Sequence, residues 1–358
     1  MDYRARQRQV QAALAASGAD AFLVTHAPNL RYLCGFTGSS GMIVLAPGKR
    51  LLFTDGRYTT QARDQAQGVR VVVARGPLLE AAAAWFSRQR VRRIGVEALH
   101  MTLSARAALL RLLSARVRLQ PLEGLVERVR MIKEPEEIAL IRSAVRLGSS
   151  LFQRALKVLR PGATEAQVAA EIEYAARRAG AQGMSFETIV AGGRRSALPH
   201  GVASTQPIPN KGFIVLDFGV ILGGYCSDMT RTVHMGPTPR WAREMYQVVR
   251  RAQEQAIATV RPGVKAGEVD CAARRVLQNA GLGRYFTHST GHGLGLEIHE
   301  PPRLGKGQAE VLEPGMVVTI EPGVYVAGRG GVRIEDVVVV TAQGCEVLTP
   351  TTKELLEL

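Results

Sequence analysis

Hydrophobic residues in the first third of the chain come in short runs that turn-forming residues bound. Such runs, for example Ala21–Val24 and Met42–Leu45, predict buried β-strands. The alanine-rich stretches between them predict helices. The predicted strands are 21–24, 42–45, 69–73 and 93–96, and the predicted helices are 61–65, 78–90 and 102–115. This alternation is typical of an α/β domain built around a central sheet.

A domain boundary is predicted near Pro135. Proline cannot continue the interior of a helix but suits its first turn, and the neighbouring glutamates favour a helix N-terminus. The apolar spacing from Ile138 to Leu156 then predicts an amphipathic helix. Because 358 residues exceed the usual domain size of ~100–200 residues, we expect two domains, 1–133 and 134–358.

The second predicted domain contains a weak internal repeat. Arg160-Pro161-Gly162 and Arg261-Pro262-Gly263 each open a helical stretch, and the similar segments 211–217 and 314–321 follow at nearly the same offset. Two matches at one offset favour a pair of α-plus-hairpin units related by a pseudo-twofold axis. The expected fold class is therefore α/β for the first domain and α+β, with a pseudo-twofold repeat, for the second.

Charge and composition narrow the classes of protein that fit this chain. The net charge is +15, and the first 135 residues, with 21 Lys and Arg against 9 Asp and Glu, account for +12 of it. No aromatic-interleaved basic motif or zinc-finger spacing accompanies this charge, so a solvated basic surface is favoured over nucleic-acid binding. The 46% hydrophobic content excludes wholesale disorder.

The location of the protein is predicted from three absences in the sequence. No apolar run approaches the ~18 residues of a membrane span. The four cysteines are scattered without a C-x-x-C pair, which suits a reducing compartment. The charged N-terminal residues include no apolar signal core. We therefore expect a cytoplasmic protein without a membrane partner.

Four acidic residues lie on strand-like arms of the repeat. Asp217 and Asp228 flank the turn at Gly223-Gly224, and their midpoint lies between residues 222 and 223. Glu321 and Glu335 are equidistant from Gly328 in a second glycine-rich turn. We expect each pair to face each other across a hairpin, where like charges destabilise a sheet. A raised pKa or a bound cation would relieve that repulsion. If the pseudo-twofold axis brings the hairpins together, a pair of divalent cations is the favoured neutraliser; exposed acids at strand edges are the alternative.

The histidines are grouped in the same domain. His288, His292 and His299 lie within twelve residues, among glycines that permit close approach of the backbone, and His200 follows Pro199. This grouping favours metal or substrate contacts over isolated core histidines. One imidazole can complete a carboxylate-rich site for two metals, which leaves other histidines for contacts with a transition state.

With these residues in place, the chain resembles the pita-bread metallopeptidases of the creatinase, aminopeptidase P and prolidase family. The five metal-ligand positions of that family are matched by Asp217, Asp228 eleven positions later, His292 in Gly-His-Gly, Glu321 in Ile-Glu-Pro-Gly and Glu335 in Val-Arg-Ile-Glu-Asp. Segments 29–39 and 54–58 resemble the creatinase-type N-terminal domain. The resemblance thus covers nearly the whole chain.

The resemblance implies a hydrolase that cleaves the Xaa-Pro bond of proline-containing di- or oligopeptides. Two divalent metal ions are implied, with Mn²⁺ favoured for oxygen-dominated ligation and Zn²⁺ or Co²⁺ as alternatives. The positions of Asp228 and Glu335 would bridge both metals. A metal-bridging hydroxide would attack the scissile carbonyl, with Glu321 as proton shuttle. His200 and His299 match positions that contact the substrate and stabilise the tetrahedral intermediate.

Three further residues follow from the same resemblance. His288 would support the substrate site, and Arg333, two residues before Glu335, would share its strand face and orient carboxylates by bidentate pairing. Arg303 matches an arginine that prolidases place near the dipeptide carboxylate. We therefore favour an Xaa-Pro dipeptidase, and Xaa-Pro aminopeptidase is the alternative.

Two other classes of function stay open at this point. A creatinase-type amidinohydrolase shares the fold without metals, and a non-catalytic pita-bread protein could bind a partner through the basic first domain. The complete set of ligand residues counts against both. The resemblance also suggests a homodimer in which the N-terminal domain helps to close the site of the partner subunit.

Overall fold

The structure is a computed structural model that describes residues 1–358. The chain divides into two compact units, Met1–Arg130 and Met131–Leu358, and the short helix α6 (Glu127–Met131) contains the division. The boundary after residue 133 that the sequence indicates stays a prediction.

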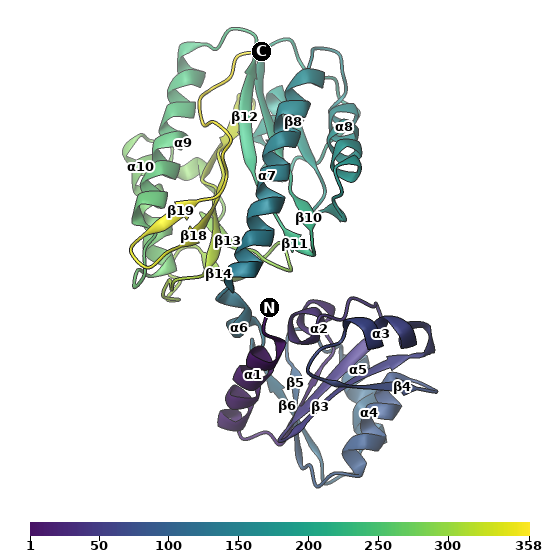
Figure 1. Ribbon diagram of the computed structural model, residues 1–358. Coiled ribbons are helices and arrows are strands. Elements are labelled where there is room, and N and C mark those ends of the chain that lie inside the picture. Colours follow the sequence, from purple (N-terminus) through teal and green to yellow (C-terminus); the bar gives the residue numbers. More distant parts are fainter. The chain divides into compact units, whose positions relative to one another are not determined.

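The N-terminal unit is an α/β unit around one mixed sheet of six strands in the order β4-β3-β2-β1-β5-β6 (Figure 1). Its strands are β1 (Ala21–Val24), β2 (Gly41–Ala46), β3 (Lys49–Asp55), β4 (Arg70–Ala74), β5 (Arg93–Glu97) and β6 (Arg118–Leu122). Its helices are α1 (Tyr3–Ser17), α2 (Ala27–Cys34), α3 (Thr59–Gln65), α4 (Leu78–Ser87) and α5 (Leu103–Leu112). The predicted central sheet is confirmed. The pattern missed two strands, β3 and β6. Strand β6 is an edge strand that can accommodate Pro121 because one side of it makes no ladder.

The C-terminal unit begins with a long helix, as predicted. Helix α7 (Pro135–Val158) starts at Pro135, and the side chains and backbone of Glu134 and Glu137 form a capping box at its N-terminus. The other helices are α8 (Glu165–Arg178), α9 (Arg240–Thr259) and α10 (Ala266–Asn279). The strands are β7 (Gly183–Met184), β8 (Ile189–Gly192), β9 (Gly212–Asp217), β10 (Val220–Leu222), β11 (Tyr225–Cys226), β12 (Thr230–Met235), β13 (Gly291–Gly293), β14 (Glu300–Leu304), β15 (Val317–Ile320), β16 (Gly323–Val326), β17 (Gly330–Arg333), β18 (Asp336–Val340) and β19 (Cys345–Val347).

The internal repeat is visible in the topology of this unit. Each half has two helices, α7 with α8 and α9 with α10, followed by a sheet whose centre is a hairpin. The sheet β12-β9-β8 of the first half corresponds to β18-β15-β13 of the second. Gly162 and Gly263 adopt the same left-handed conformation, with φ of 82° and 85°, before α8 and α10. A residue with a Cβ would be strained at both positions.

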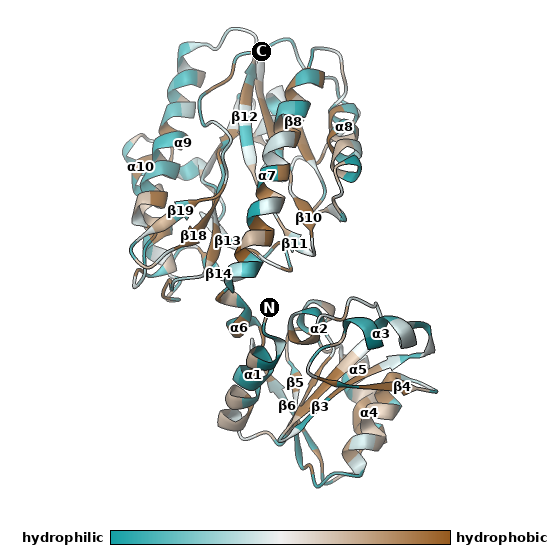
Figure 2. Ribbon diagram, in the orientation of Figure 1, coloured by the Kyte–Doolittle hydropathy of each residue, from teal (hydrophilic) through white to brown (hydrophobic).

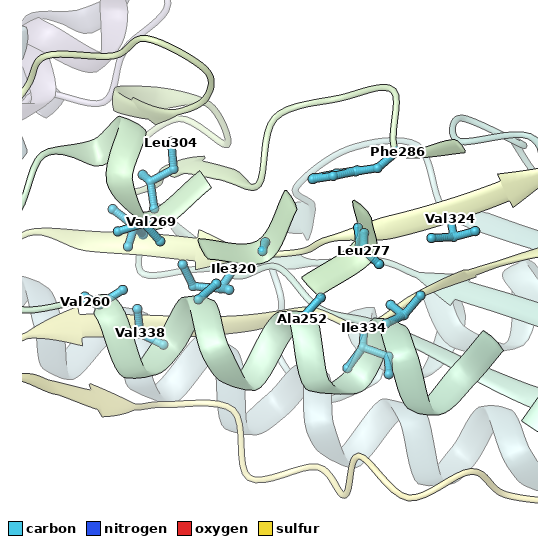
Figure 3. Packing of buried hydrophobic residues seen from close by; sticks show 14 of the residues in the cluster. Ala252, Val260, Val269, Leu277, Phe286, Leu304, Ile320, Val324, Ile334 and Val338 are labelled. Atoms are coloured by element: carbon cyan, nitrogen blue, oxygen red, sulfur yellow. The ribbon is translucent and has the colours of Figure 1, made fainter. Parts of the chain in front are cut away.

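The largest core of the C-terminal unit lies where α9 and α10 pack on β15 and β18. Leu277, Ile320 and Val338 are fully buried there (Figure 3). Burial of each such side chain contributes ~1.5–3 kcal/mol relative to exposure. Figure 2 shows the corresponding pattern, with β18 largely hydrophobic and α9 carrying many hydrophilic residues as well. This packing holds the strand ends from which the acidic residues project.

The register of the first hairpin corrects one prediction. Asp217 pairs with Thr230 rather than with Asp228. The reason is the turn itself: Gly223 and Gly224, both with positive φ, are its two central residues, and Leu222 pairs with Tyr225. The centre of the turn therefore lies one position later than the midpoint of the two aspartates. Asp228, two residues before Thr230, is the diagonal neighbour of Asp217 on the same face.

The second hairpin keeps the predicted register. Ile320 pairs with Asp336 in the ladder of β15 and β18, and Gly323 pairs with Arg333 in the ladder of β16 and β17. Glu321 and Glu335 occupy opposite positions in the short break between these ladders. All four acidic residues thus stand at strand ends or interruptions, where their side chains are not confined to the sheet pleat.

Candidate metal centre and active site

One cavity of about 810 Å³ in the C-terminal unit collects every site residue that the sequence singled out. Its lining includes His200, Asp217, Asp228, His288, His292, His299, Arg303, Glu321, Arg333 and Glu335. These residues come from both halves of the repeat, separated by up to 135 positions in the sequence. The convergence of the two hairpins is therefore observed, while the roles of the individual residues stay predictions.

The centre of the cavity has the donor atoms of a metal site. Ligand atoms of Asp228, His292 and Glu335 all lie within 4.8 Å of one another. His292 Nε2 lies 3.6 Å from Asp228 Oδ2 and 3.5 Å from Glu321 Oε1. Cysteine takes no part, and oxygen donors outnumber nitrogen, a set that suits hard or borderline divalent cations.

His292 is oriented so that one ring nitrogen is available to a cation. Its Nδ1 lies 3.0 Å from the carbonyl oxygen of Gly293, to which it donates a hydrogen bond in the tautomer protonated there. Burial lowers the pKa of His292 to about 4, so the ring is neutral at pH 7. A neutral imidazole with Nε2 unprotonated is the form that binds metal.

The carboxylates of the cavity repel one another in the absence of cations. Burial, and then the charges of neighbouring carboxylates, raise the pKa values of Asp228 and Glu335 well above the ordinary range. Burial also raises the pKa of Glu321 to about 8. Asp217 Oδ1, Asp228 Oδ1 and Glu335 Oε1 are buried without any hydrogen-bond partner. Buried anionic oxygens without donors are costly, and a pair of divalent cations would satisfy all three, so the residues fit the implied metals.

Arg333 organises the carboxylates through a different contact from the one predicted. Its Nη2 donates to Asp217 Oδ2 and its Nε donates to Thr230 Oγ1 at 3.0 Å. Thr230 Oγ1 in turn donates to Glu335 Oε2 at 2.7 Å. Bidentate pairing with a carboxylate, which the sequence analysis expected, is not observed, because the remaining guanidinium nitrogen donates to Tyr325 and to the backbone of Pro199.

Tyr325 links this network to His288. The Tyr325 hydroxyl lies 2.9 Å from His288 Nε2, and His288 Nδ1 lies 2.8 Å from the carbonyl oxygen of Ser289. Burial lowers the pKa of His288 to about 4, so the ring is neutral and its Nε2 accepts a hydrogen bond from the Tyr325 hydroxyl. His288 therefore lies in the wall of the cavity with both nitrogens used, which favours a supporting role.

His299, His200 and Arg303 have more exposed side chains. The His299 ring lies edge-to-face against His292, with centroids 4.4 Å apart, and burial followed by the charge of His200 lowers its pKa. Arg303 Nε donates to Ser289 Oγ at 2.7 Å. This contact orients the arginine and leaves its two terminal nitrogens for a ligand.

Thr230 and Tyr325 belong to this network but are not among the candidate residues that the sequence indicates. The sequence could have indicated Thr230, because it follows Asp228 by two residues and a strand places such positions on one face. No sequence pattern could have indicated Tyr325, because it reaches Arg333 and His288 only through the packing of the second hairpin.

Replacement of Thr230 by valine tests the link between Arg333 and Glu335. Thr230→Val keeps the side-chain shape and removes both hydrogen bonds, and we expect metal affinity to fall about 10- to 100-fold, as for other partners of ligating groups. Calorimetric titration with Mn²⁺ measures this. The matched control is Thr232→Val, since Thr232 Oγ1 contacts only the backbone of Arg333. Equal affinities for the two variants would contradict the role given to Thr230.

None of the helices combines the length and apolar character needed to cross a membrane.

Comparison with known proteins gives two family matches. Residues 139–342 match the metallopeptidase family M24, and residues 6–132 match the creatinase/prolidase N-terminal domain. The chain is 43% identical over 235 residues (66% of this chain and 68% of the relative) to the Xaa-Pro dipeptidase of Pyrococcus furiosus.

Two solved structures are similar over nearly the whole length. An Xaa-Pro dipeptidase from Bacillus anthracis is 39% identical, with a TM-score of 0.97 over 100% of both chains. The X-Pro aminopeptidase from Thermotoga maritima is 35% identical, with a TM-score of 0.89 over 95% of this chain and 98% of the other.

Proposed function

The chain belongs to metallopeptidase family M24 and carries a creatinase/prolidase N-terminal domain, and from this membership we propose that it hydrolyses Xaa-Pro peptide bonds with two divalent metal ions. The family and the fold class that the sequence indicates are confirmed. The observation that carries the proposal is the set of three buried carboxylate oxygens without partners, gathered in one cavity.

Five residues would hold the metals, namely Asp217, Asp228, His292, Glu321 and Glu335. When bound, two divalent cations lower the pKa of a shared water and polarise a carbonyl, which are the requirements for attack on an amide. Their four positive charges would offset the four carboxylates. Oxygen-dominated ligation favours Mn²⁺, and Zn²⁺ or Co²⁺ are the alternatives.

The residues of the chain itself would bind the peptide and move its protons. The Glu321 carboxylate lines the cavity, where its Oε1 lies 3.5 Å from His292 Nε2. We propose that Glu321 takes the proton of the attacking water and passes it to the proline nitrogen as the bond breaks. His299 and His200, both at the cavity wall, would donate hydrogen bonds to the oxygen on which charge develops.

The hypothesis that the protein is an Xaa-Pro dipeptidase rests on Arg303. A free proline carboxylate needs a cationic partner with available donors, and the terminal nitrogens of Arg303 meet that need at the cavity wall. The similarity to proteins named Xaa-Pro dipeptidase points the same way. The alternative is Xaa-Pro aminopeptidase, as the Thermotoga maritima protein is named. A cavity of about 810 Å³ also lies in the range that encloses drug-sized ligands, so its volume admits a longer peptide.

Arg303→Ala is expected to impair dipeptides selectively. Loss of a charge-assisted hydrogen bond of ~1.5–3 kcal/mol should lower kcat/KM for Ala-Pro about 10- to 100-fold. The effect should fall mainly on KM, while Ala-Pro-Ala, which lacks a carboxylate at that position, changes little. Arg329→Ala, at an exposed hairpin turn, is the control. Equal losses for both peptides would argue against carboxylate recognition by Arg303.

The proposed function is tested by metal analysis of the purified protein together with hydrolysis of Ala-Pro and Ala-Pro-Ala. We expect about two divalent ions per chain and faster turnover of Ala-Pro. Faster turnover of the tripeptide would favour the aminopeptidase. Absence of both metal and peptidase activity would contradict the metallopeptidase hypothesis and leave a metal-free amidinohydrolase or a non-catalytic binding protein.

The assembly and the location of the protein complete the proposal. We propose a cytoplasmic protein, in keeping with its scattered cysteines, and a homodimer, in keeping with the family resemblance. We propose no nucleic-acid partner, because the excess of positive charge lies in the N-terminal third, outside the residues of the cavity. A mass measurement in solution that finds only monomer would contradict the dimer.

A further inference from the structure

Lys133 and Glu300 form an ion pair inside the C-terminal unit. Lys133 Nζ lies 3.2 Å from Glu300 Oε2, and the two side chains are only 1% and 4% exposed. Burial of two charges is expensive, and an apolar pair of similar volume is often as stable. Stability by itself therefore does not account for this pair.

Glu300 fixes the course of the loop 294–299. Its Oε1 accepts a hydrogen bond from the backbone of Glu297 at 3.0 Å. Gly295 lies so close that a Cβ there would be 2.9 Å from both carboxylate oxygens of Glu300, so a larger residue would displace the carboxylate. The carbonyl of Gly295 accepts from the backbone of Cys226 at 2.7 Å. The loop is thus wrapped around one buried carboxylate.

Lys133 is itself held by the backbone that leads to the metal centre. Its amide donates to the carbonyl of Gly315 at 2.9 Å, and Ile132 forms a bridge with Met316. Residue 316 directly precedes β15, the strand that ends before Glu321. Lys133 therefore connects the β15 segment with the loop that Glu300 organises.

His299 directly precedes Glu300, and this arrangement would fix the position of His299 in the cavity wall. No hydrogen bond within the chain holds the His299 imidazole. Its ring packs edge-to-face against that of His292, with the two centroids 4.4 Å apart. Its position must then follow from the backbone on either side. We propose that Lys133 is a positioning residue, which acts through Glu300 to hold the loop that presents His299 to the substrate. This inference rests on the proposed function, in which His299 contacts the peptide.

The first test is Lys133→Met, which keeps the length of the side chain and removes the ammonium group that pairs with Glu300. We expect kcat for Ala-Pro to fall about 10- to 100-fold, as for a displacement of about 1 Å at an active site. KM should change by less than about 3-fold, because binding of the peptide ends is not affected. Manganese content should equal that of the wild type. Lys157→Met, the same change at an exposed position of α7, is the matched control.

A double variant separates positioning from stability. Lys133→Met with Glu300→Leu removes both buried charges, so Tm should return to near the wild-type value. It also removes the acceptor for the Glu297 amide, so kcat should stay low. Recovery of kcat together with Tm would overturn the proposal, because the loss in the single variant would then have come from an uncompensated buried charge.

The NMR signal of a carbon-bound imidazole proton of His299 reports on the position of the ring without requiring turnover. The chain has seven histidines, so the signals are few, and His299→Asn identifies the one in question. We expect Lys133→Met to shift or broaden the His299 signal and to leave that of His234 unchanged. An unmoved His299 signal would overturn the proposal. A wild type that hydrolyses no Xaa-Pro peptide would instead contradict the proposed function, and the spectrum would still report on the loop.

Discussion

Asp228→Asn is expected to lower kcat/KM for Xaa-Pro hydrolysis about 10³-fold or more, which corresponds to ~4 kcal/mol of lost transition-state stabilisation. The Asp228 carboxylate lies close to both His292 and Glu335. A neutral amide cannot replace the anionic ligand that the proposed function assigns to this position, so metal content should also fall. Metal analysis and the Ala-Pro assay measure the two effects.

The same substitution should stabilise the protein from which metal has been removed. Burial and three neighbouring carboxylates raise the pKa of Asp228, so its ionisation is unfavourable without cations. Asparagine removes that cost, and Tm of the chelated variant at pH 8 should exceed that of the chelated wild type. A gain in stability with a loss of activity is the signature of a residue kept for metal binding.

The control for this prediction is Asp64→Asn, an exposed aspartate on α3. Neither its activity nor its metal content should change. Retention of full metal content and activity by Asp228→Asn would contradict the assignment of Asp228 as a ligand.

Removal of the metal ions should abolish activity and make stability depend on pH. In the chelated protein, the pKa values of Asp228, Glu321 and Glu335 are raised, so the folded state holds protons that the unfolded chain has lost. Stability then falls as the pH rises from the ordinary carboxyl value of 4.5 to about 8, the pKa of Glu321. With metals bound, the carboxylates are paired and this loss should disappear.

Melting curves of chelated and Mn²⁺-loaded protein at pH 5, 6.5 and 8 measure the effect. Free metal at 1,000 times its Kd stabilises the folded state by ~4 kcal/mol. A domain of 150–250 residues shifts by ~2–4 °C per kcal/mol, so the gap at pH 8 should be roughly 10 °C. The gap should narrow at pH 5, where protons compete with the metal.

The chelated Asp228→Asn variant is the control for the pH dependence, and its melting temperature should fall less steeply between pH 5 and 8. A chelated wild type whose Tm is constant or rises over this range would show that the carboxylates are not the source of the instability.

Secondary structure and the set of candidate residues were accessible from the sequence to a large extent. The helix that begins at Pro135 and the strands β1, β2 and β5 follow from local periodicity and capping chemistry, which depend on neighbouring residues alone. The ten candidate residues of the cavity were all named from motifs, and the structure brings them together.

What failed was the geometry between elements. Asp217 faces Thr230, because the two glycines of the turn set the register one position away from the symmetric guess. Arg333 forms no bidentate pair with a carboxylate, because only Nη2 donates to Asp217, while Nη1 donates to Tyr325 and Pro199 and Nε donates to Thr230. Hydrogen-bond geometry of this kind depends on side-chain directions that no sequence pattern contains.

The sequence by itself determined the long helix at Pro135, several strands, the repeat and the residue types of the candidate site, since periodicity, turn glycines and motif spacing are properties of short segments. Tertiary structure alone decided which carboxylate oxygens lack partners, which tautomer leaves His292 Nε2 available, and how Lys133 reaches Glu300 across 167 positions. Those features arise only when distant segments are packed together, because burial and hydrogen bonding are then set by neighbours in space.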